Sequence, residues 1–130
     1  MKVVKSWERE EVTINEPYKR TLKVLFAPDK ENVEELTFTL VLLHPHSQTD
    51  YHMHDRPELM YIISGEGLMI GKDTTYEMRP DMAFWVPKNE MHQMKNTNDY
   101  EMKFVSAFIP AFSAHDIYQR CIEAAKKNPQ

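Results

Sequence analysis

Three histidines and one glutamate are the side chains of this sequence best suited to chemistry: His52, His54, Glu58 and His92. In an extended strand, side chains alternate between the two faces, so His52 and His54 point the same way. A short turn through residues 55–57 returns Glu58 to that face. Two neutral imidazoles and a carboxylate suit first-row transition metals and leave coordination positions open. His92 begins another expected strand and is the natural fourth ligand.

The elements that must position these side chains are short strands separated by turns. The pattern of β-branched and apolar residues predicts strands at 20–26, 37–43, 59–63, 68–70, 74–78, 82–86 and 103–109. Glycine-containing turns follow several of them, as at residues 64–67 and 71–73. Short strands at intervals of about ten residues are typical of a sandwich or barrel.

The C-terminal segment has a helical pattern instead. Ser113 is placed to cap a helix, with Asp116 three residues later in the capping-box position. An apolar stripe follows at helical spacing, formed by Ala114, Ile117, Tyr118, Cys121, Ile122 and Ala125. We expect a helix of about three turns that packs on the barrel or on a partner chain.

The composition indicates one domain. The chain has 130 residues, a net charge of −4 and a single cysteine, Cys121. This balance disfavours nucleic acid and an anionic membrane as the main partner. The charged N-terminus has no signal-peptide apolar stretch and no run has membrane-helix length, so we expect a cytoplasmic protein. The expected divisions are N-terminal strands and a barrel extension at 1–35, a barrel core at 36–110 and a helix at 111–130.

Two motifs in this chain resemble those of the cupin family. His52, His54, Glu58 and Gly65 match the first motif, and Pro87, His92 and Asn96 match the second, at the family's spacing. His46, Asp81 and Asn89 stand where the family usually has glycine. Asn89 is a mild departure, because asparagine tolerates the left-handed backbone better than most residues. The chain resembles the small single-domain type of cupin.

The resemblance implies an all-β, single-domain double-stranded β-helix, or jelly-roll barrel, with the short C-terminal helix added to it. It also implies one divalent transition metal per chain on the three-His, one-Glu set. Family members use iron, manganese, nickel, cobalt, copper or zinc, and many are homodimers. We therefore expect a homodimer with a small-molecule ligand.

Strand alternation from the ligands predicts the pocket lining. Met60 and Ile62 share the face of Glu58, and Met94 and Asn96 share that of His92. Inward-facing candidates on other strands are Phe84, Phe104 and Ser106. The alternative for all of these side chains is plain core packing. Polar candidates for the mouth are His44, His46, Gln48, Asp50, Tyr51 and Arg56, and for each the alternative is a solvated surface position.

Two classes of function fit this pattern. The first is a metal-dependent enzyme, of the dioxygenase, decarboxylase, isomerase or lyase type, that acts on a small organic substrate chelating the metal through oxygen. The second is a non-catalytic module that binds or senses a small molecule. Four converging ligands disfavour a purely structural role. The residues leave the metal, the substrate and the reaction type open.

Overall fold

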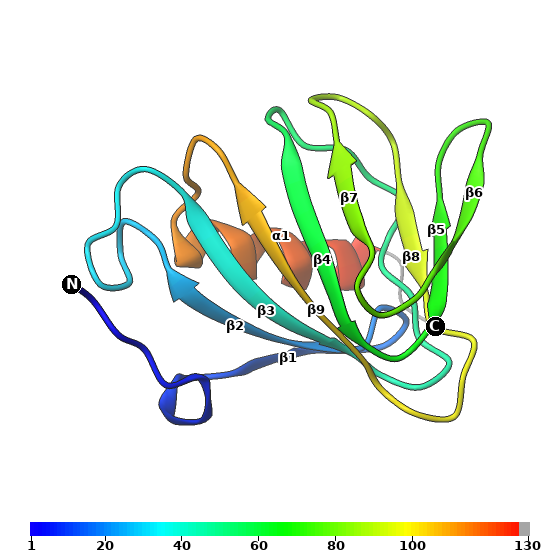
Figure 1. Cartoon of the computed structure of the whole chain (residues 1–130), viewed down its shortest axis with the longest axis horizontal. Coiled ribbons are helices and arrows are strands. Elements are labelled where there is room, and N and C mark those ends of the chain that lie inside the picture. Colours follow the sequence, from blue (N-terminus) through cyan, green and yellow to red (C-terminus); the bar gives the residue numbers. More distant parts are fainter. Residues whose placement is uncertain (128–130) are drawn as a thin grey trace.

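Two antiparallel sheets face each other in the computed structural model, which describes residues 1–127 (Figure 1). The larger sheet has the strand order β1-β2-β3-β9-β4-β7, and the smaller has the order β6-β5-β8. The strands are β1 (Val12–Ile14), β2 (Arg20–Phe26), β3 (Thr37–Leu43), β4 (Glu58–Ser64), β5 (Gly67–Ile70), β6 (Thr75–Met78), β7 (Ala83–Val86), β8 (Gln93–Lys95) and β9 (Met102–Phe108). A 3₁₀ turn, η1 (Ser6–Glu8), precedes them, and α1 (Ala114–Lys127) follows.

The strands form where apolar and polar residues alternate, because one face of each strand must be buried. In β4, Glu58, Met60 and Ile62 are buried, whereas Leu59 and Tyr61 are exposed. Strand β9 alternates in the same way, with its buried side chains facing those of β4 across the pairing. The inner faces of the two sheets therefore enclose the core, and Glu58 begins its strand on the inner face.

The seven predicted strands are confirmed, each within one residue at either end. The expected strand through His52 and His54 is wrong as a regular element. Residues 51–54 are extended chain, and His52 forms an isolated bridge with His92. Asp55 and Arg56 turn the chain at once into β4, which leaves too little length for a strand.

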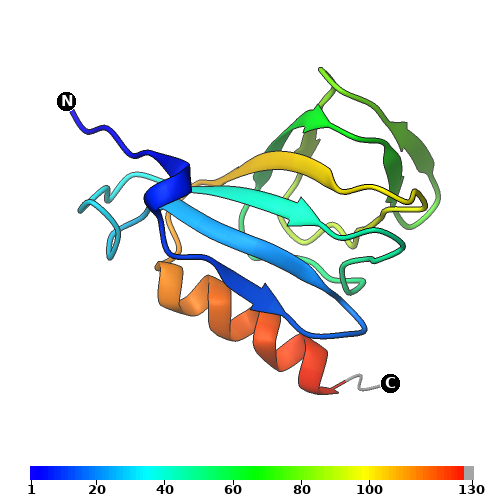
Figure 2. The same cartoon turned by 90° about the horizontal axis from the view of Figure 1, so that it is seen from below.

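Helix α1 lies beside β1 and β2, away from the smaller sheet (Figure 2). Ser113 Oγ accepts a hydrogen bond from the Asp116 N–H, as predicted. Asp29, in the β2–β3 connection, accepts hydrogen bonds from the N–H groups of Ala114 and His115. The helix has 14 residues, about one turn more than expected, because strong helix formers continue to its end. No helix in the described part of the chain is long and apolar enough to span a membrane.

The apolar stripe of α1 is confirmed, since five of its six members are buried and Ile122 is half-buried. Tyr118 also accepts a hydrogen bond at its hydroxyl from the Val24 N–H, at 3.0 Å. This hydrogen bond and the Asp29 cap together hold the helix against the strands. The helix face that carries Ile117 and Cys121 is thereby held over the interior of the barrel.

The three positions where glycine was expected keep a left-handed backbone without it. The φ angles of His46, Asp81 and Asn89 are 54°, 71° and 64°. Asp81 is supported by the Tyr61 hydroxyl, which donates to its carboxylate at 2.8 Å. Gly65 differs, because its φ is 82° and an added Cβ would lie 2.7 Å from the carbonyl oxygen of Glu101. The loop shapes therefore persist despite the three substitutions.

Candidate metal centre

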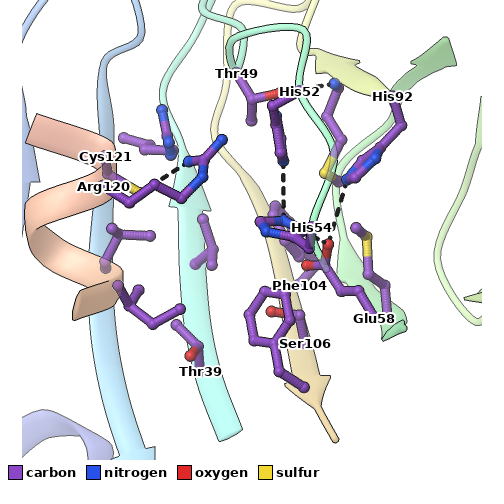
Figure 3. Close-up of a pocket in the computed structure, with 17 residues that line it drawn as sticks. Thr39, Thr49, His52, His54, Glu58, His92, Phe104, Ser106, Arg120 and Cys121 are labelled. Atoms are coloured by element: carbon purple, nitrogen blue, oxygen red, sulfur yellow. Dashed lines mark hydrogen bonds and ion pairs between the residues drawn. The ribbon is translucent and has the colours of Figure 1, made fainter. Parts of the chain in front are cut away.

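The four predicted metal ligands lie together inside the barrel mouth, where their side chains point toward one another (Figure 3). His52 and His92 are held side by side by two backbone hydrogen bonds, of 3.0 and 2.8 Å. Glu58 is the first residue of β4, and His54 lies in the extended segment before it. The potential ligand atoms are all within 4.8 Å of one another.

Backbone carbonyls orient two of the three imidazoles. His52 Nδ1 donates to the Asp50 carbonyl at 2.7 Å, and His92 Nδ1 donates to the Glu90 carbonyl at 3.0 Å. In the neutral ring the second nitrogen, Nε2, then carries the lone pair, which is the arrangement of a metal ligand. The contacts are 3.1 Å between Nε2 of His52 and His54, and 3.5 and 3.3 Å from Glu58 Oε1 to Nε2 of His54 and His92.

The electrostatics of the centre keep Glu58 ionised and the His52 imidazole neutral, which are the forms that bind metal. Burial would raise the pKa of Glu58, but the imidazoles of His54 and His92 outweigh burial and hold it at about 2. Burial lowers the pKa of His52 to about 3, helped by the positive charge of Arg120. Burial opposes protonation of His92 too, yet its carboxylate neighbour Glu58 raises the pKa of His92 overall. A divalent ion would replace the proton on His92 that the Glu58 carboxylate favours, because metal ligands must be deprotonated.

The residues fit a divalent metal on a second ground. Glu58 Oε1 and His92 Nε2 are buried, and within residues 1–127 neither has a hydrogen-bond partner of good geometry. Buried polar atoms without partners are costly, and a bound ion would satisfy both of these. Atoms that bind one ion at about 2.1 Å lie about 3.0–3.4 Å apart, close to the contacts of 3.1, 3.3 and 3.5 Å found here. The set could hold one ion and would leave coordination positions open.

A cavity of about 60 Å³ adjoins the four residues, and most of its exposed lining is apolar. Four predicted lining residues contribute to it: Met60, Met94, Phe104 and Ser106. Apolar walls also come from Leu22, Val41, Phe108 and Ile117. The cavity is therefore shaped by strands of the larger sheet, by β8 and by α1 together.

Three other predicted lining residues, Ile62, Phe84 and Asn96, lie elsewhere. Ile62 is fully buried and pairs with Phe104, but it is two residues farther from the ligands than Met60 and belongs to the core. Phe84 lines a separate open groove of about 900 Å³ and packs edge-on against Tyr76. His92 lines both spaces, so this candidate ligand lies where the cavity and the groove are divided. Alternation correctly predicted inward-facing side chains, but it could not predict this division. Asn96 is also buried, and it bonds backbone groups instead of lining the cavity.

Sequence reasoning missed two arginines in the cavity wall, Arg20 and Arg120. Arg120 reaches in from α1 on the wall opposite the ligands (Figure 3). Its Nη2 is 2.9 Å from Asp50 Oδ2, and Arg20 Nη2 is 3.8 Å from Asp50 Oδ1. Arg20 and buried Leu22 are two residues apart in β2 and so share a face, which is a signal for an inward charge. Arg120 is three residues after buried Ile117, so it lies near the same face of α1.

The polar residues expected at the mouth have diverse roles. Asp50 accepts a hydrogen bond from Arg120 and lies near Arg20. Burial would raise the pKa of Asp50, but the charges of Arg120, His52 and Arg20 lower it overall. His44 Nε2 contacts Thr21 Oγ1 at 3.0 Å, and His46 pairs with Asp99 on the surface. Arg56 donates to the Ala111 carbonyl and stacks 3.6 Å from the centroid of the Phe112 ring, so it anchors the segment before α1. Tyr51 is exposed, and Gln48 forms an isolated β-bridge with Lys95.

Comparison with known proteins points to one family. The model of that family, described as the cupin domain, matches residues 39–108. Auxin-binding protein T85 of Nicotiana tabacum is 25% identical in an alignment of 79 residues that covers 53% of this chain and 42% of that protein. The uncharacterized HTH-type transcriptional regulator YfiF of Bacillus subtilis (strain 168) is 25% identical over 84 residues, 65% of this chain and 27% of that protein. The matches thus span less than half the length of either relative.

Solved structures agree with the fold. Ectoine synthase from P. lautus superposes with a TM-score of 0.77 at 19% identity, covering 92% of this chain and 86% of that one. The polyketide cyclase RemF from Streptomyces resistomycificus gives 0.74 at 20% identity, with 92% and 91% covered. A predicted oxalate decarboxylase from Thermotoga maritima gives 0.75 at 21% identity, with 84% and 99% covered. At these identities the likeness establishes the barrel and its helix, and the predicted all-β architecture is confirmed.

Proposed function

The chain belongs to the cupin family, and on that premise we propose that it is a metal-dependent enzyme acting on a small organic substrate that binds the metal through oxygen. The observation that carries the proposal is the convergence of His52, His54, Glu58 and His92 beside an internal cavity. Open coordination positions next to a cavity suit catalysis better than a structural role, since structural zinc is usually fully enclosed by protein ligands.

The chain's own residues hold and shape this centre. Carbonyls of Asp50 and Glu90 fix two imidazole rings, and burial keeps the pKa of the His52 imidazole low. Apolar walls, including Met60 and Phe104, lower the local dielectric in the adjoining cavity, which strengthens electrostatic interactions there. When bound, a divalent ion supplies Lewis acidity toward a substrate oxygen, or activates water or dioxygen.

Metal content tests the ligand assignment. We expect elemental analysis of the protein from its native host to give about one divalent transition metal per chain, of a kind that the measurement identifies. His92→Ala should lose the metal, because it removes one of four ligands and leaves Glu58 Oε1 without its 3.3 Å neighbour. The matched control is His115→Ala, which removes an exposed histidine on α1. Full metal content in His92→Ala would overturn the assignment.

The reaction class is tested by turnover. The metal-loaded protein is screened against small oxyacids and diketones under air and under anaerobic conditions. Turnover that requires dioxygen indicates a dioxygenase, whereas turnover in both conditions indicates decarboxylase, isomerase or lyase chemistry. His92→Ala should abolish either kind of turnover.

A non-catalytic binding or sensing module is the second candidate. Its support is the similarity to an auxin-binding protein and to an HTH-type transcriptional regulator. Tight binding of a small chelator without any turnover, in protein that holds its full metal content, favours this function over the enzyme.

We also propose a homodimer in the cytoplasm. Leu59 and Trp85 pair on the outward face of β4 and β7, next to exposed Tyr61 and Ile63, and an apolar surface of this kind suits a second copy of the chain. Light scattering after size exclusion tests the dimer, and Trp85→Glu should give a monomer.

Cys121 is buried and free, as a reducing compartment allows. Cell fractionation tests the location.

A further inference from the structure

We infer that the cavity binds the carboxylate of a small acid through Arg20 and Arg120, while the metal centre takes an oxygen at the other end of the molecule. The inference rests on the proposed function for the metal end and names the substrate class. Both arginines line the same cavity as the four metal ligands. They come from β2 and α1, outside residues 39–108 that the family model matches.

Arg20 is a buried cation with unused hydrogen-bonding capacity. Its exposed fraction is 4%. A guanidinium has five N–H donors, and within residues 1–127 one group on Arg20, Nη1, donates a hydrogen bond, to the Tyr18 carbonyl at 3.0 Å. Its Nη2 lies 3.8 Å from Asp50 Oδ1, which is beyond hydrogen-bond distance. The remaining donors can therefore serve a ligand in the cavity.

Arg120 shares the counter-ion of Arg20. Its Nη2 donates to Asp50 Oδ2 at 2.9 Å, and its Nη1 has a weak contact of 3.8 Å with the sulfur of Cys121. Two cations thus face one carboxylate. Arg120 is hydrogen-bonded to it and its side chain is 30% exposed, so the cation without a close counter-ion is the buried Arg20, beside a mainly apolar cavity. Charge in such surroundings is costly unless paired, so a monoanion entering the cavity is favoured.

The geometry favours a carboxylate as that anion. Guanidinium groups bind planar carboxylates through two parallel hydrogen bonds, and a single negative charge balances the cluster. The apolar walls of Leu22, Val41 and Ile117 then accept a short hydrocarbon body. Arg120 and Asp50 also line an outer groove of about 490 Å³ with Tyr18 and Tyr51. The carboxylate therefore faces the groove, and the other end of the acid faces the metal ligands.

The cavity volume limits the acid to a small one. One water occupies about 10–15 Å³ on this measure, so 60 Å³ holds about four to six waters. A ligand of about four to seven non-hydrogen atoms fits that space. A suitable probe is 3-hydroxybutanoate, which has a carboxylate, a short body and a hydroxyl oxygen. Its amide, 3-hydroxybutanamide, has the same shape without the charge.

Calorimetric titration of zinc-loaded and metal-free protein with this pair tests the inference. We expect the acid to bind the wild type at least tenfold more tightly than the amide, since hydrogen bonds to charged groups are the stronger class. Arg120→Gln should weaken binding of the acid at least tenfold and change binding of the amide less than twofold. Arg79→Gln is the matched control, because Arg79 pairs with Glu77 on the exposed surface, and it should leave both affinities unchanged.

The outcomes separate this inference from the proposed function. Equal binding of acid and amide to the wild type, or an unchanged preference in folded Arg120→Gln, would overturn it, as would tighter binding of inorganic phosphate than of the acid. If Arg120→Gln does not fold, Arg120→Lys keeps the charge without the planar fork, and the wild-type comparison of acid and amide still decides. A protein that prefers the acid but holds no metal contradicts the proposed function alone.

Discussion

Asn96→Ala should destabilise the protein strongly, although Asn96 contacts no expected substrate. Its side chain is 2% exposed and connects three segments of chain. Nδ2 lies 3.0, 3.2 and 2.8 Å from the carbonyl oxygens of Leu43, His44 and Tyr100, and Oδ1 accepts from the Asn98 N–H at 3.0 Å. Two hydrogens on Nδ2 and one acceptor bond give about three hydrogen bonds, worth about 1 kcal/mol each. The expected loss is therefore about 3 kcal/mol.

That loss converts into a shift of the melting temperature. Unfolding entropy near 60 °C is about 2.1 cal/mol/K per residue, or about 0.27 kcal/mol/K for this chain of 130 residues. A loss of about 3 kcal/mol then lowers Tm by about 11 °C. Circular dichroism melts with excess chelator measure the effect without a contribution from bound metal.

The matched control is Asn98→Ala. The Asn98 side chain donates one exposed hydrogen bond, to the Glu66 carbonyl at 2.7 Å, so its loss should cost less than about 1 kcal/mol. A Tm for Asn96→Ala within about 3 °C of the wild type, or equal to that of Asn98→Ala, would refute the reasoning. Buried amide bonds would then not secure the end of β3 to the segment that follows β8.

Other perturbations should act as follows. A divalent metal at 100 times its Kd stabilises the folded protein by about 2.7 kcal/mol. Differential scanning fluorimetry should therefore show Tm rising by about 10 °C in the wild type and in His115→Ala, but not in His92→Ala. Hydrogen bonds from Ala114 and His115 lower the pKa of Asp29 against the effect of burial. The Asp29 carboxylate therefore stabilises the folded protein fully above its unfolded pKa of about 3.9, and this contribution is lost as pH falls through the pKa of the folded state. Asp29→Asn, an uncharged cap, should lose less Tm between pH 5 and 2.5; equal losses would contradict this. Asn89→Val should cost about 1–2 kcal/mol in denaturant unfolding and Asn89→Gly less than about 1, because φ is 64° there; equal costs would remove the conformational reason.

The sequence correctly predicted that the four candidate metal ligands lie together, because residue type and spacing carry that information. His52, His54 and Glu58 lie close in the chain, and His92 lies at the matched spacing of a second motif, so little folding information was needed to bring them together. The strands were predictable for a similar reason, since alternation is local. The segment at 51–54 shows the limit, because two imidazoles can share a face without regular strand pairing.

The opposite wall of the cavity could not be predicted from spacing. Arg120 reaches it because α1 folds back over the larger sheet, and that packing depends on contacts such as Tyr118 with Val24. Phe84 shows the same limit, since its face was predicted but the space that it lines was not. Side-chain direction is a property of one strand, whereas a cavity is a property of several elements together.

The two walls of the cavity can change separately in evolution. The candidate metal ligands lie within the part of the chain that the family model matches, whereas Arg20 and Arg120 lie on either side of it. On the proposed function, mutations in the terminal segments would alter which molecules the cavity binds while leaving the candidate metal ligands in place. Exchange of the helix between relatives is then a direct route to new selectivity, and a designer could follow it by grafting one element instead of redesigning the barrel.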